Sequence, residues 1–125
     1  MGAKIEARVE HHFPVPAEAI YKAWLDPASV RVWMGEALRG LGLSGEIQRI
    51  EIEPRVGGSF FNSDLRNGKE ARHWGTYEQL VHPSKIVFTW TVDERDEADP
   101  SRFTLTIEQE TDGCMVMFVH EMDEV

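Results

Sequence analysis

The first residues of the chain alternate between polar and apolar side chains with a period of two. Over Lys4–Phe13, Ile5 and Val9 fall on the same face, and charged residues fall on the opposite face. That period predicts a half-buried strand. Pro14 ends the strand, and Pro16 suits the first turn of a helix.

Two helices are expected next. Ala17–Leu25 carries an apolar stripe at helical spacing. Asp26-Pro27 then supplies a cap residue and a first helical position, which predicts a second short helix through Trp33. The glycine-rich segment from Gly35 to Gly45 predicts a loop that is long for a compact domain.

From Glu46 onward the pattern predicts about six strands joined by short turns. Short connections make neighbouring strands antiparallel. A sheet of this size buries one face on two short helices only if it curls around them, so we expect an α+β fold with a concave sheet. The expected strands are Glu46–Glu53, Ser59–Leu65, Lys69–Leu80, Lys85–Val92, Arg102–Gln109 and Cys114–Glu121.

Length and composition fit a single domain. The chain has 125 residues, of which 42% are hydrophobic, enough for one core over residues 1–125. No apolar run approaches the ~20 residues that span a bilayer. The first ten residues lack a signal-peptide pattern, and Cys114 has no partner for an internal disulfide. These features predict a cytoplasmic location.

The negative charge is concentrated in the last third of the chain. Residues 93–125 carry 11 acidic and 2 basic residues, which accounts for the whole net charge of -9. This argues against nucleic acid and anionic membranes as partners, because both require a basic surface. The acidic segment is either a solvated hairpin and chain end or a docking surface for a basic partner.

Several short motifs, spread over nearly the whole chain, resemble a known family. In order and spacing they are similar to the homologues of the heat-shock-chaperone ATPase activator, within the START-like (SRPBCC, birch-pollen-allergen-like) superfamily. The motifs are Phe13-Pro14-Val15-Pro16, Ala23-Trp24, Asp26-Pro27, Trp33, Glu53-Pro54-Arg55-Val56-Gly57-Gly58-Ser59-Phe60, Gly75-Thr76-Tyr77, Ile86-Val87-Phe88-Thr89-Trp90 and Val119-His120-Glu121.

The resemblance implies a helix-grip fold, in which a seven-stranded sheet wraps around a long C-terminal helix. In this superfamily the space between sheet and helix often holds a hydrophobic ligand, and some relatives are cyclases, dehydratases or hydrolases. The sequence after His120-Glu121 contains no such helix. We therefore expect the long C-terminal helix to be missing and the cavity to be an open groove.

Residues on the predicted concave face are candidates for ligand binding. Tryptophan and tyrosine offer apolar surface together with one hydrogen-bonding edge, although core packing is the competing interpretation for every aromatic residue. The candidates are Trp33, Phe60, Asn62, Asp64, Tyr77, Phe88, Trp90, Phe103, Phe118 and His120.

Three polar candidates have two interpretations each. Asn62 and Asp64 share a face with Phe60. If that face is the concave one, Asp64 is buried and needs a partner. If the register shifts by one, both residues face water. His120 is either a core residue with satisfied hydrogen bonds or a polar group that meets a ligand or acts as an acid or base.

No catalytic set, metal site or cofactor is expected. The five histidines lack metal-ligand spacing, and the adjacent His11 and His12 point to opposite faces of a strand. Cys114 and His120 share a face but lie about 20 Å apart along their strand.

Three functions remain open. The first is binding of a hydrophobic or aromatic small molecule without catalysis. The second is regulation of a chaperone ATPase or a related stress-response interaction. The third is an enzyme of the cyclase or dehydratase type that uses His120, Asp64 or Tyr77. We also expect self-association as a homodimer, because an open concave face would expose a large apolar patch.

Overall fold

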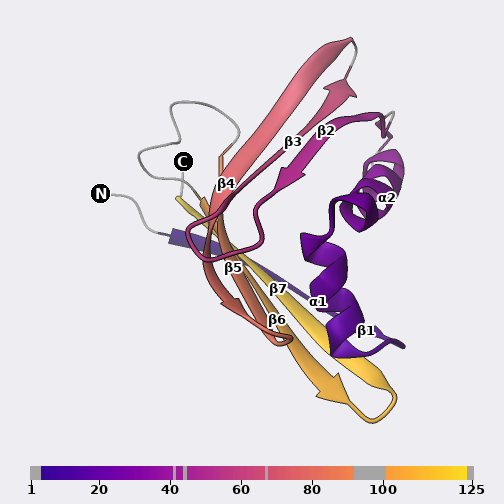
Figure 1. The fold of residues 1–125 in the computed structure, drawn as a ribbon, viewed down its shortest axis with the longest axis vertical. Coiled ribbons are helices and arrows are strands. Elements are labelled where there is room, and N and C mark those ends of the chain that lie inside the picture. The colour runs from indigo at the N-terminus through magenta and orange to yellow at the C-terminus, as the bar shows by residue number, and fades with distance from the viewer. Residues whose placement is uncertain (1–3, 41, 44, 67, 92–100, 124–125) are drawn as a thin grey trace.

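The computed structural model describes residues 4–40, 42–43, 45–66, 68–91 and 101–123. One strand and two helices precede six further strands, as the sequence predicts (Figure 1). The elements are β1 (Lys4–Phe13), α1 (Ala17–Leu25), α2 (Pro27–Gly40), β2 (Ile47–Ile52), β3 (Ser59–Arg66), β4 (Lys69–Val81), β5 (Lys85–Trp90), β6 (Ser101–Glu110) and β7 (Gly113–Asp123).

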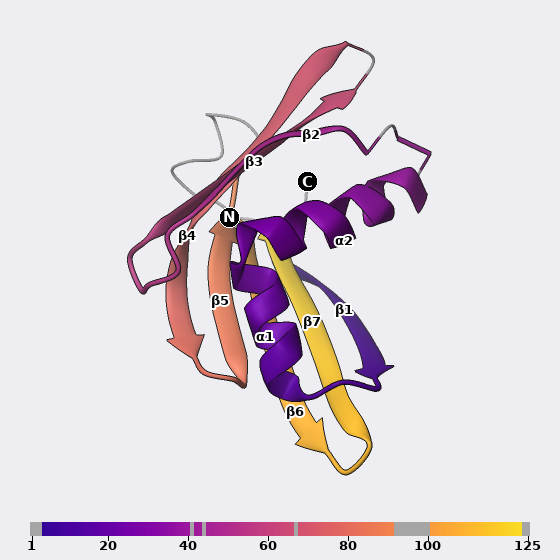
Figure 2. The same ribbon diagram turned by 45° about the vertical axis from the view of Figure 1, so that its right-hand side comes forward.

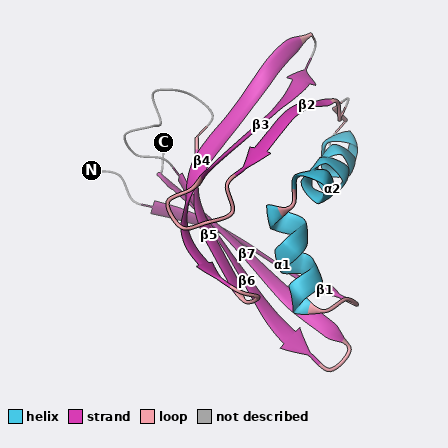
Figure 3. Cartoon of the chain, in the orientation of Figure 1, coloured by secondary structure: helices cyan, strands magenta, loops and turns pink. Residues whose placement is uncertain are grey.

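The strands form one seven-stranded antiparallel sheet in the order β1-β7-β6-β5-β4-β3-β2. The sheet is curved, and both helices lie on its concave side (Figures 1 and 2). Because β1 and β2 lie at opposite edges, the α1–α2 segment crosses from one edge of the sheet to the other. The expected α+β fold with a concave sheet is confirmed. Figure 3 shows the division between the strand layer and the helix layer.

The bend of the sheet is centred on β4. This strand pairs with β3 up to Thr76 and with β5 from Tyr77 onward, with a bulge before Gln79. A Cβ atom on Gly75 would lie 1.9 Å from the Thr89 carbonyl oxygen and 2.8 Å from the Phe60 ring. Only glycine therefore fits where the two halves of the sheet meet.

The second helix is longer than the sequence suggested. The predicted loop begins at Gly35, but α2 continues to Gly40. Gly35 lies inside the helix, where glycine costs about 1 kcal/mol relative to alanine. The chain at Gly45 packs closely on this turn of the helix, because a Cβ atom on Gly45 would lie 2.7 Å from the Gly35 carbonyl oxygen and from Cγ of Arg39. Tertiary packing thus outweighs the local signal.

The start of α2 agrees with the sequence. The Asp26 carboxylate accepts hydrogen bonds from the backbone nitrogen and the hydroxyl of Ser29, at 3.0 and 2.8 Å. These bonds lower the pKa of Asp26. Asp26 is therefore the predicted N-cap.

The core lies between the sheet and the helices. Leu105 and Cys114 are fully buried, and Ile86 is 1% exposed. No helix follows β7 within the described part of the chain. Neither described helix is long and apolar enough to cross a membrane. Val92, at the end of the strand expected over Lys85–Val92, and the acidic residues Asp93, Glu94, Asp96 and Glu97 lie outside the described residues.

Candidate ligand-binding groove

A cavity of about 320 Å³ lies between the concave face of the sheet and the two helices. Its size is at the lower end of the range that is usual for small-molecule sites. Among the lining residues that the structure describes, Asn62 is the one strongly polar side chain, and the others are apolar or aromatic.

The structure brings together eight of the ten candidate residues. They are Trp33, Phe60, Asn62, Tyr77, Phe88, Trp90, Phe103 and Phe118. Asp64 and His120 do not line the cavity. Several further residues line the cavity that the sequence did not single out. Two of them, Ile50 and Ile52, alternate along β2 and pair with Asn62 and Phe60 on β3. The residues not selected are Trp24, Val30, Met34, Ile50, Ile52, Phe61 and Ile86.

Aromatic rings on neighbouring strands form the floor of the groove. The Phe88 ring lies 5.4 Å from Phe60 in an edge-to-face arrangement and 5.3 Å from Phe103 in a stacked one. Trp90 lies edge-to-face against Phe103 at 5.5 Å. Such contacts add about 0.5–1.5 kcal/mol each beyond the buried area. The floor is therefore held in shape without a ligand.

The helices contribute the opposite wall. Trp24 and Trp33 lie 4.7 Å apart between ring centroids. The Trp33 indole N–H donates to the Ala23 carbonyl oxygen at 2.9 Å. Because this bond uses the polar edge of Trp33, the side chain offers the groove apolar surface only.

A second cavity of about 350 Å³ lies toward β1. Trp24, Trp33 and Phe118 line both cavities and form the boundary between them.

The strand register places four candidates in one row. Tyr77 lies opposite Phe88, Phe88 opposite Phe103, and Phe103 opposite His120. Tyr77 and His120 are therefore three strand spacings apart, about 14 Å. Asp64 lies opposite Ala71, which is about 20 Å from Tyr77 along β4. The three groups suggested as acids or bases do not converge on one point.

Asn62 supplies the polar part of the groove, and His73 contacts it from outside the lining. Asn62 is 6% exposed, so the inward interpretation of its strand face is correct. Its Oδ1 lies 3.1 Å from Nδ1 of His73. Burial, followed by the nearby Arg66 charge, lowers the pKa of His73 below its ordinary value of 6.5, and Asp64 acts in the opposite direction. His73 is thus neutral at neutral pH, and its Nδ1–H donates to Asn62.

Asp64 also faces inward and has the partner that its burial requires. It is 2% exposed and accepts hydrogen bonds from Nε and Nη2 of Arg66, at 2.8 and 3.4 Å. A two-point guanidinium contact satisfies a buried carboxylate well. Asp64 therefore has a structural role beside the groove.

His120 packs against an aromatic ring. Its imidazole stacks on Phe103 with ring centroids 3.9 Å apart and an angle of 12° between the planes. Burial lowers the pKa of His120. Its Nε2 atom is buried, and none of the described residues makes a hydrogen bond with it.

The family described as "Activator of Hsp90 ATPase homolog 1-like protein" matches residues 14–125. No match was found among curated proteins.

Solved structures of several bacterial proteins share the fold. A protein of unknown function from Staphylococcus aureus has a TM-score of 0.79 and 23% identity over 99% of this chain and 72% of its own. A Chromobacterium violaceum protein has a TM-score of 0.76 and 22% identity over 93% and 78% of the two chains. A Rhizobium loti protein has a TM-score of 0.74 and 21% identity over 100% and 85%.

Proposed function

Because this chain belongs to the family of Activator of Hsp90 ATPase homolog 1-like proteins, we propose that it binds a hydrophobic, aromatic small molecule in its groove. The observation that carries the proposal is a preformed cavity of about 320 Å³ with aromatic walls and a single strongly polar lining residue. Sites for small molecules combine a largely apolar surface with a few placed polar groups.

The polar group indicates what kind of ligand would fit. His73 uses Oδ1 of Asn62, so the Asn62 amide nitrogen remains to donate a hydrogen bond. A flat aromatic ligand with a carbonyl or phenolic oxygen would match this donor. Its rings would lie against Trp90 and Phe103.

A neutral fluorescent aromatic compound, N-phenyl-1-naphthylamine, tests the proposal. We expect its fluorescence to rise on binding and to fall when an aromatic ketone displaces it. Trp90→Ala should weaken binding by about tenfold or more, which corresponds to about 1.4 kcal/mol. Asn62→Leu should weaken the ketone while leaving the hydrocarbon-like probe bound.

Thr104→Ala is the matched control. Thr104 lies on the neighbouring strand β6, pairs with Val87 and does not line the cavity. The variant should bind like the parent chain. A folded protein that binds no aromatic compound, or binds it equally well after Trp90→Ala, would contradict the proposal.

A second candidate function is regulation of a heat-shock chaperone. The description of the family and the acidic residues 93–125 favour it. Neutralising Asp93, Glu94, Asp96 and Glu97 should then weaken capture of the purified chaperone. Capture that is unchanged by these substitutions would remove the charge argument.

Self-association would cover the open side of the groove. Trp24, Trp33 and Trp90 are half-buried around the groove, and a second copy could bury them further. Light scattering across a range of concentrations should then detect a dimer. A monomer at every concentration would rule the dimer out.

A further inference from the structure

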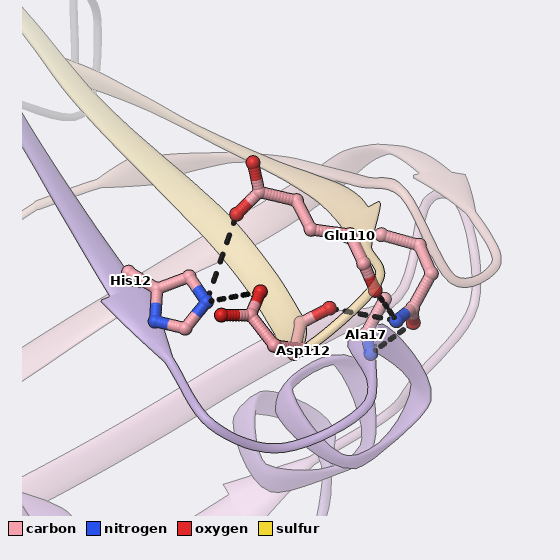
Figure 4. Close-up of polar contacts among 6 residues, drawn as sticks. His12, Ala17, Glu110 and Asp112 are labelled. Carbon is pink, nitrogen blue, oxygen red and sulfur yellow. Dashed lines mark hydrogen bonds and ion pairs between the residues drawn. The ribbon is translucent and has the colours of Figure 1, made fainter.

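One histidine and two carboxylates meet outside the groove. His12 lies near the end of β1, Glu110 is the last residue of β6, and Asp112 lies in the turn before β7. Nε2 of His12 is 3.7 Å from Oε1 of Glu110 and 3.3 Å from Oδ1 of Asp112. Figure 4 shows this nitrogen pointing toward both carboxylates. One oxygen or nitrogen atom from each of the three residues lies within 4.8 Å of the others.

None of the residues that the structure describes makes a hydrogen bond with Nε2 of His12. The side chain is 35% exposed, but its Nε2 atom is buried from solvent, and neither carboxylate makes a hydrogen bond with it. Nε2 of His12 therefore has two carboxylate oxygens nearby and no hydrogen bond to either of them.

The distances agree with the geometry of a metal site. Bonds of about 2.1 Å in a tetrahedral arrangement place ligand atoms about 3.4 Å apart. The two measured separations from Nε2 are 3.3 and 3.7 Å. One imidazole and two carboxylates suit a divalent transition metal such as zinc.

The charge around the cluster also favours a cation. No described lysine or arginine forms an ion pair with Glu110 or Asp112. Two further carboxylates lie on the same outer face of the sheet. Glu108 on β6 and His12 on β1 both pair with Met115 of β7. Glu10 lies two residues before His12 on β1.

Neighbouring contacts hold the three residues in place. Gln109 donates to the carbonyl oxygens of Glu110 and Gly113, at 2.8 and 2.6 Å, and so fixes the turn. A Cβ atom on Gly113 would lie 2.1 Å from the Phe13 carbonyl oxygen. The end of β1 therefore packs directly on the turn, and a cation would meet ligands that are already positioned.

We propose that His12, Glu110 and Asp112 bind a divalent transition-metal cation, with zinc as the best-fitting member. The cation joins the edge strand β1 to the β6–β7 turn and keeps a fourth coordination position for water. Once the free metal concentration exceeds the dissociation constant of the site, the free energy of unfolding rises with the logarithm of that concentration. The site is separate from the groove, so it does not depend on the function proposed above.

Isothermal titration of the metal-stripped full chain with zinc alone tests the site. We expect one zinc ion per chain and a higher unfolding temperature in its presence. His12→Asn, Glu110→Gln and Asp112→Asn should each weaken binding by about tenfold or more. Glu108→Gln is the matched control, because it removes a neighbouring carboxylate that is not one of the three ligands, and it should weaken binding less than any of the three ligand variants.

Cobalt supplies a second measurement. The visible absorption of the bound cobalt should be typical of a site with one nitrogen ligand. His12→Asn should abolish this absorption, while the circular dichroism of the variant stays that of the native fold. Saturable zinc binding that is equally strong in His12→Asn would overturn the proposal. The absence of binding below about 1 mM would also overturn it, and would leave an ion pair between protonated His12 and the carboxylates as the explanation.

Discussion

Nδ1 of His73 lies 3.1 Å from Oδ1 of Asn62, and the same imidazole stacks on the Trp90 indole with centroids 5.0 Å apart. One residue that does not line the groove thus orients two that do. It determines which end of the Asn62 amide is available to a ligand. The orientation of the Asn62 amide in the groove therefore depends on the Nδ1–H of a neighbouring side chain.

Stability should fall as the solution is acidified toward pH 5. The pKa values of His73 and His120 lie below 6.5 in the folded protein, mainly because both rings are buried. At a pH between the pKa of either histidine in the folded protein and its pKa in the unfolded chain, the unfolded chain binds more protons than the folded one. The free energy of unfolding is therefore highest above pH 6.5 and decreases below it. Urea unfolding at a series of pH values measures this slope.

The matching variants are His73→Gln and His120→Gln. Each should reduce the pH dependence of the free energy of unfolding, and the double variant should reduce it most. A slope that is the same in the double variant and the parent chain would mean that other groups cause it.

Removal of Arg66 should destabilise the chain strongly. Arg66→Ala would leave the buried Asp64 carboxylate without its partner, at a cost of about 3 kcal/mol, since the arginine is partly exposed. The double variant Asp64→Leu/Arg66→Leu should cost less than the single change. Arg72→Ala breaks the exposed pair with Glu70 and should change the free energy of unfolding little, because solvent screens the pair. If Arg66→Ala and Arg72→Ala lowered the free energy of unfolding equally, the buried Asp64–Arg66 pair would have no special role in stability.

Gln109 should contribute to stability through a distant helix end. Its Oε1 accepts a hydrogen bond at 2.8 Å from the backbone nitrogen of Ala17, whose helix has Pro16 as an N-cap without a side-chain bond. Gln109→Ala should lower the free energy of unfolding by about 1–2 kcal/mol. Glu108→Ala, one residue earlier and exposed, is the control. A similar loss in both variants would show that the cap contributes little.

Cys114 should be inert in the native protein. The side chain is fully buried, and burial followed by the Glu110 charge raises the pKa of its thiol. Less thiolate and no access both slow modification. A disulfide reagent should react with one thiol per chain in denaturant and far more slowly in buffer. Rapid reaction in buffer would indicate frequent local opening of the β6–β7 hairpin.

Periodicity predicted which residues of the groove share a face, and it left open whether that face of β3 is the concave one. The period of two in β3 places Phe60, Asn62 and Asp64 on one face, and the structure buries all three. The same argument applies to Phe88 and Trp90 on β5. These predictions hold because a strand alternates its side chains whatever its neighbours do.

The remaining features depend on contacts between distant segments. The bulges in β2 and β4 interrupt the alternation, so Ile47 and not Gln48 lies near Asp64. The extension of α2 through Gly35 depends on the approach of Gly45. His12 meets Glu110 and Asp112 only after β1 has paired with β7, so no local spacing could have indicated the cluster.

The positions of β1 and β2 at opposite edges have a consequence for ligand choice. The covalent connection between these edges consists mainly of α1 and α2, and helices resist stretching because their backbone hydrogen bonds would have to break. Widening the sheet would pull on that connection, whereas a longer molecule could extend along the strands without moving it. We therefore expect the protein to discriminate sharply between ligands of different breadth and to accept a series of homologues that differ in length.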